Sequence, residues 1–159
     1  MKRLMAAAII AATCATALSA KDADRRLATV RKAFVVPVDD LGDDRPVAAC
    51  FAEHIATHTP IVAVKEKDEA DVIFKVKAHL PSATTRVMVG MMGGSPSADL
   101  FAELPDGTKL WSDGAKLRRA IGKAGKLEGS DAAKGVECGL ADELLDTLRE
   151  AMRKARDKK

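Results

Sequence analysis

In the first half of the chain, two short runs of apolar residues flank a segment whose apolar residues recur at helical spacing. A continuous apolar run over 32–38 contains a proline at its end and predicts a strand buried on both faces. After an acidic turn, apolar residues at four-residue steps predict a helix from about Pro46 to Thr57. The run 61–64 predicts a second strand, parallel to the first, because the intervening helix returns the chain in the same direction.

The second half begins with strict alternation over 71–80, which predicts a strand with one packed face. Three further runs, separated by glycine- and proline-containing turns, predict an antiparallel meander over 84–92, 97–104 and 108–113. A basic connector over 114–129 then leads to a long amphipathic helix from Ser130 to about Arg156, where Gly135 and Gly139 weaken the start or allow another backbone to approach.

These elements predict the α/β class and a two-layer sandwich. The sheet is expected to be mixed, with about five to six strands, a parallel strand–helix–strand start and an antiparallel meander, and with both main helices on one face. Residues 21–31 are expected to form a linker or short helix, and 32–157 a single domain, which suits a chain of 159 residues.

Residues 1–20 have the pattern of a secretory signal peptide, with Lys2 and Arg3 before a short apolar run and small residues at the end. The run is too short to span a bilayer, so the mature chain is expected to have no transmembrane segment and to be periplasmic or secreted. Cys14 leaves a second reading open, in which it carries the lipid anchor of an outer-membrane lipoprotein.

Charge and composition narrow the possible functions. The formal net charge is +3, but removal of Lys2 and Arg3 lowers the 26 basic residues to 24 against 23 acidic ones. A nearly neutral domain in which aromatic residues make up 3% of the chain does not predict nucleic-acid binding. The chain also lacks the serine-hydrolase, zinc-protease and phosphate-loop motifs, so we expect no catalytic residues, no enzymatic activity and no cofactor.

Without the leader, two cysteines remain, Cys50 and Cys138, and an oxidising compartment favours a disulfide between them over two separately buried thiols. Cys50, His54 and His58 follow at four-residue steps on the first helix. They therefore share a stripe that suits Zn²⁺ or copper, although partly buried histidines explain it as well. A small metal-handling protein is accordingly the alternative function.

The hairpin turn at 105–107 sets an expected register in which Glu103 faces Lys109, Ala102 faces Leu110 and Phe101 faces Trp111. This register would place the two aromatic rings on one sheet face, away from Ala102. Together with methionines of the neighbouring loop, they form the expected partner surface, which consists of Phe101, Trp111, Met88 and Met92.

Three phrases of the sequence carry a family resemblance: AFVVPV at 33–38, EADVI at 69–73 and FAELPDGTKLWS at 101–112. With the order of elements, they resemble exported bacterial envelope domains. Examples are the periplasmic domain of the curli secretion channel, the amino-terminal domain of the Tol translocation protein and the lipoprotein activators of peptidoglycan synthases. The resemblance implies a fold and a binding role with an envelope protein as partner, and it implies no catalytic residue. We therefore expect a non-enzymatic interaction or assembly accessory domain of the envelope.

Overall fold

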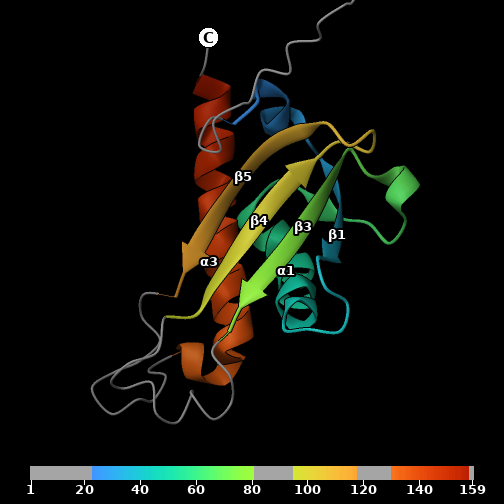
Figure 1. The fold of residues 1–159 in the computed structure, drawn as a ribbon. Helices are drawn as coiled ribbons and strands as arrows, with labels where there is room; N and C mark the ends of the chain where they lie inside the picture. The colour runs from blue at the N-terminus through green and yellow to red at the C-terminus, as the bar shows by residue number, and fades with distance from the viewer. Residues whose placement is uncertain (1–22, 81–94, 118–129, 158–159) are drawn as a thin grey trace, which may run out of the picture.

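The computed structural model describes residues 23–80, 95–117 and 130–157 (Figure 1). The strands are β1 (Lys32–Pro37), β2 (Val62–Ala63), β3 (Val72–His79), β4 (Ser97–Glu103) and β5 (Lys109–Lys116). The helices are α1 (Asp44–His58) and α3 (Ser130–Asp157), with short 3-10 helices η1 (Arg25–Thr29) and η2 (Lys67–Glu69).

The five strands form one mixed sheet in the order β2-β1-β3-β4-β5. β1 pairs in parallel with β2 and β3, whereas β3, β4 and β5 form an antiparallel meander. Both helices lie behind the sheet in Figure 1 and pack against each other. The predicted two-layer α/β sandwich, with its parallel start and both helices on one face, is therefore confirmed.

The core lies between the helices and the sheet. Alternate residues of the strands point toward the helices, which explains the regular burial of β4 at every second position. Phe51 of α1 meets Phe74 of β3 edge to face, with the ring centroids 5.6 Å apart. The other large side chains that are fully buried include Leu27, Ile55, Ile61, Leu100, Leu110, Leu140, Leu144, Leu145 and Leu148.

The start of α1 is held by a buried carboxylate. Asp44 is 5% exposed, and its two oxygens accept the backbone N–H groups of Asp39 and Ala78 at 2.8 and 2.7 Å. The helix consequently begins two residues before Pro46, which occupies its first turn. At the other end the backbone N–H of Thr59 donates to the carbonyl of Ile55, and Pro60 follows.

Two glycines shape the first turns of α3. Gly135 has a φ of 79° and a ψ of 169°, which breaks the helix there, and this backbone region is open mainly to glycine. Gly139 allows a close approach, since an added Cβ would lie 3.2 Å from Cδ1 of Leu117. Gly135 therefore interrupts the start of the helix, as the sequence allowed, whereas the group that approaches Gly139 is a side chain and not another backbone.

The segment expected as a linker or short helix contains η1. The Asp24 carboxylate caps η1 by accepting the N–H of Arg26, and the Asp24 N–H donates to the carbonyl of Leu110 in β5. Leu27 is buried in the core, so this segment is packed as part of the domain. No helix in the described part of the chain combines the length and apolar character that crossing a bilayer requires.

Some expectations fall outside the described residues. These are the signal peptide at 1–20 with Cys14, the strand at 84–92 with Met88 and Met92, and the connector beyond Leu117. β5 continues to Lys116, three residues past its expected end and into the start of that connector.

Candidate functional site

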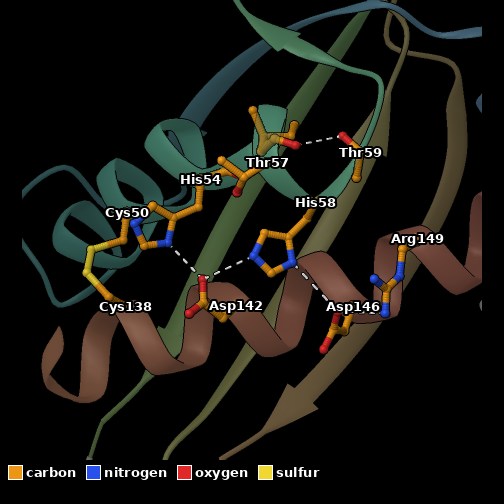
Figure 2. Close-up of polar contacts among 10 residues, drawn as sticks. Cys50, His54, Thr57, His58, Thr59, Cys138, Asp142, Asp146 and Arg149 are labelled. Carbon is orange, nitrogen blue, oxygen red and sulfur yellow. Dashed lines mark hydrogen bonds and ion pairs between the residues drawn. A yellow bond between two sulfur atoms is a disulfide. The ribbon is translucent and has the colours of Figure 1, made fainter. Parts of the chain in front are cut away.

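A ladder of polar and sulfur contacts joins α1 to α3 (Figure 2). The first of these contacts is the disulfide between Cys50 and Cys138, whose Cα atoms lie 5.1 Å apart. One turn further along both helices, Nδ1 of His54 lies 2.7 Å from Oδ1 of Asp142. Both pairs are separated by 88 positions, so the two helices run in the same direction along this contact.

The polar contacts one turn further on, around His58, are longer. The ring of His58 lies between two carboxylates, with Nε2 3.8 Å from Asp142 and Nδ1 3.7 Å from Asp146. Asp146 also contacts Arg149 at 3.1 Å. A carboxylate partner therefore stands beside each imidazole that the sequence offered as a metal ligand.

The disulfide has the pairing that the sequence favoured. Both cysteines are partly buried at the contact between the helices, where their thiols would otherwise lie side by side. His54 and His58 share the stripe with Cys50, as the four-residue spacing predicted. Within 23–80, 95–117 and 130–157, no group of three or more histidine, cysteine, aspartate or glutamate side chains is arranged to hold a metal ion.

The sheet face away from the helices is named here the open face. In the described part of the chain no helix covers it (Figure 1). Strand register places the side chains of Phe34 and Ile73 in one cross-strand row. The next row contains Val36 on β1 and Phe101 on β4, with Lys75 of β3 between them. Ile73 is buried, and Phe34, Val36 and Phe101 are partly exposed. These four residues form an apolar stripe over three strands, which Lys75 interrupts between Val36 and Phe101.

Charged side chains surround this apolar stripe. Lys75 contacts Glu103 at 2.6 Å, and His79 contacts Asp99 at 3.1 Å. The open face also carries lysines that have no acidic partner among the described residues, among them Lys77, Lys109 and Lys116. The open face therefore combines an interrupted apolar stripe with an excess of positive charge.

The expected pairing of Phe101 with Trp111 is wrong. Glu103 does face Lys109, but a register shift follows, so that Trp111 faces Ala102 and Phe101 faces Ser112. The extra residue is Leu110, which the sequence had placed opposite Ala102. A bulge of this kind moves every later side chain to the other face of the sheet.

The bulge therefore separates the two aromatic residues of the expected partner surface. Trp111 is 5% exposed and belongs to the core on the helix side, while Phe101 stays on the open face. Glu103 also forms its ion pair with Lys75 of the neighbouring strand rather than with Lys109. Sequence reasoning missed the bulge because the turn at 105–107 fixes only the first pairs of the hairpin.

Trp111 lines a groove of about 290 Å³ between β5 and α3, named here the β5–α3 groove. Thr147 and Ala151 also line it, and its charged residues are Asp113, Glu143, Asp146, Glu150 and Lys154. Side-chain hydrogen bonds from Arg153 lower the pKa of Glu150 to about 2, so this carboxylate is ionised at neutral pH. Sequence reasoning missed the groove because its lining comes from two segments far apart in the chain.

A larger hollow of about 790 Å³ lies at the carboxyl ends of β1 and β3, beside the start of α1. Asp39, Asp43 and Asp44 line it on one side, and Lys77 and His79 on the other. Asp44 is engaged in backbone hydrogen bonds, and Asp39 accepts the N–H of Leu41. The acidic loop thus acts in turn formation and in joining the start of α1 to β3. Asp43, the N-cap residue of α1, makes no side-chain hydrogen bond to the helix.

Comparison with known proteins shows no family. No family model matches the chain, and no curated protein matches it. Among solved structures, a DUF4136 family protein from Bacteroides thetaiotaomicron is 10% identical, with a TM-score of 0.43 over 86% of this chain and 96% of that one. A PelC dodecamer from Paraburkholderia phytofirmans is 12% identical, with a TM-score of 0.38 over 86% and 94%. Uncharacterized lipoprotein B from Nitrosomonas europaea is 13% identical, with a TM-score of 0.35 over 78% and 81%.

Proposed function

We propose that this chain is an exported protein of the bacterial envelope that works as a protein-interaction domain without catalytic activity. The observation that carries the proposal is the open face. There the apolar stripe, interrupted by Lys75, lies next to three lysines that have no acidic partner among the described residues. Exposed apolar surface that is bordered by charge is typical of protein recognition sites.

The charge on the open face indicates the kind of partner. Lys77, Lys109 and Lys116 are spread over β3 and both ends of β5, so a partner surface with acidic side chains would meet them as it covers Phe101. Such complementarity favours encounter and fixes the orientation of the complex. We therefore expect an envelope protein with an acidic, partly apolar surface.

The disulfide supports export. A bond between Cys50 and Cys138 forms and persists in oxidising compartments and is rare in the reducing cytosol. The signal peptide expected at 1–20 leads to such a compartment. The absence of catalytic motifs in the sequence supports the non-enzymatic part of the proposal.

Site-specific photocrosslinking in cells tests the interaction. A photoreactive phenylalanine analogue at Phe101 is expected to give a discrete protein adduct, and the same analogue at Glu53, exposed on α1, gives none. Exchange of Lys77 and Lys109 for glutamate should abolish the Phe101 adduct. Equal adduct yields from positions 101 and 53 would contradict the proposal. So would a Phe101 adduct whose yield is unchanged when Lys77 and Lys109 are exchanged for glutamate.

Cell fractionation with thiol labelling tests export separately. The protein released by cold osmotic shock should show no reactive thiol until it is denatured and reduced. Recovery of the chain in the cytosolic fraction with its leader intact would overturn the envelope assignment, whatever the crosslinking result.

A further inference from the structure

β5 is the last strand of the sheet order, so within 23–80, 95–117 and 130–157 one side of its backbone has no neighbouring strand. The N–H of Leu117 donates to the carbonyl of Pro96, which makes this a hydrogen-bonded pair of the β4–β5 ladder. Because hydrogen-bonded and non-hydrogen-bonded pairs alternate in an antiparallel ladder, Ser112, Gly114 and Lys116 direct their backbone groups away from β4.

Part of this edge already has partners within the chain. The Leu110 carbonyl accepts the N–H of Asp24, and the Gly114 N–H donates to the Asp113 carboxylate at 2.8 Å. The backbone groups of Ser112 and Lys116 have no other backbone partner in the described part of the chain. The stretch 112–116 is therefore a short strand edge. One of its N–H groups, that of Gly114, donates to the Asp113 side chain, which a peptide carbonyl could replace.

The β5–α3 groove lies directly beside this stretch. Trp111, Asp113 and Ala115 pair with core residues of β4, so their side chains point to the helix side, where the groove is. Any strand added to the β5 edge places every second side chain on that same side. A side chain so placed would meet Trp111 and the carboxylates that surround it.

The charges of the groove indicate which side chain it suits. Asp146 contacts Arg149, and Glu150 contacts Arg153 and Lys154. Asp113 and Glu143 have no cationic partner in 23–80, 95–117 and 130–157. A lysine or arginine over Trp111 would therefore gain two carboxylate partners and an aromatic neighbour.

The same charges disfavour a second copy of the chain as the occupant. Pairing of two β5 edges about a two-fold axis would bring one acidic groove against the other. In the register that pairs Ser112 with Gly114, Asp113 of each copy would also face its counterpart directly. A basic segment of another polypeptide would bring neither a second acidic groove nor a second Asp113 to this edge.

We propose that the β5 edge and the β5–α3 groove bind an extended basic peptide segment by strand addition. The segment donates and accepts backbone hydrogen bonds at Ser112 and Lys116, and it inserts a lysine or arginine between Asp113 and Glu143. Binding releases Asp113 from the Gly114 N–H, which then donates to the peptide. This site lies at the sheet edge, and it uses the backbone of Lys116, whose side chain belongs to the open face.

Titration with a blocked hexapeptide of alternating lysine and threonine tests the proposal, because the chain has one tryptophan and that residue lines the groove. We expect saturable change in Trp111 fluorescence. Glu143→Gln and Asp113→Asn should each weaken binding about tenfold, whereas Glu53→Gln, which removes a charge from α1, should not. Equal weakening by all three variants would mean general electrostatic attraction and overturn the site.

Two further peptides separate strand addition from charge alone. A hexapeptide with the same side chains but methylated backbone nitrogens should bind at least tenfold more weakly, and one with glutamate in place of lysine should not bind. Hydrogen exchange at Ser112 and Lys116 should slow with the parent peptide. Equal binding of the methylated peptide, or a concentration-dependent dimer that the peptide fails to dissociate, would overturn the proposal.

Discussion

The imidazole of His54 and the carboxylate of Asp142 lie 2.7 Å apart on the turn that follows the Cys50–Cys138 disulfide. The covalent bond fixes the distance between α1 and α3 at one point, and the hydrogen bond extends that contact by a turn. Together with the longer contacts of His58 to Asp142 and Asp146, these two links give the helices a defined register along their axes.

Replacing His54 with alanine should destabilise the domain by about 1 kcal/mol, because Asp142 loses a hydrogen bond in a partly buried position. Urea unfolding followed by circular dichroism measures the change in free energy. His58→Ala is the matched control, since the carboxylates nearest its ring are 3.7 and 3.8 Å away. A larger loss for His58→Ala than for His54→Ala would contradict the ladder.

The disulfide is expected to stabilise the fold by about 4.6 kcal/mol in the chain-entropy model, because it closes a loop of 88 residues. The double variant Cys50→Ala, Cys138→Ala should lose most of this free energy of unfolding in oxidising buffer. With dithiothreitol present, the wild type should approach the double variant. Identical unfolding curves in oxidising buffer would show that the cross-link contributes nothing.

Acid should weaken the contact between β1 and β3 through Asp71. Its carboxylate accepts the backbone N–H groups of Arg31 and Lys32 at 3.0 and 2.9 Å, and these hydrogen bonds hold its pKa below the usual range. A lowered pKa in the folded state adds stability above the ordinary aspartate pKa, and this stability is lost as the pH falls through the folded-state pKa.

Asp71→Asn should therefore cost about 1 kcal/mol at pH 7, after allowance for solvent screening, and nothing at a pH below the folded-state pKa. Thermal melts of both proteins between pH 7 and pH 2 follow the difference. Asp68→Asn, which removes an exposed charge from η2, should leave the pH dependence unchanged. A wild-type advantage that persists at the lowest pH would refute the assignment.

The two aromatic residues of the hairpin should respond differently to truncation. Trp111→Ala is expected to cost about 3 kcal/mol, because the indole ring is buried between β5 and α3. Phe101→Ala should cost about 1 kcal/mol, since this ring is partly exposed on the open face. Chemical unfolding of both variants gives the comparison, and a reversed order would place Trp111 on the open face after all.

Much of the fold follows from local periodicity. The alternation in β3 and β4 and the four-residue steps in α1 reflect a backbone whose side chains point to fixed sides, so the sequence alone identified these elements. The cysteine pair was also predictable, because both residues border an apolar helical stripe. The ends of elements were less predictable, and α1 begins at Asp44 because its carboxylate accepts a hydrogen bond from distant Ala78.

The candidate sites depended on longer-range packing. One bulged residue, Leu110, reverses the side of the sheet on which Trp111 lies, and no local pattern in the strand requires that bulge. The carboxylate partners of His54 and His58 lie about 88 positions away, on a helix whose register is set by the whole core. Sequence by itself determined which side chains each element buries, because backbone geometry repeats every two or 3.6 residues. Only the tertiary structure decided which of these residues meet, because the contacts between elements depend on register, and a shift of one residue changes them all.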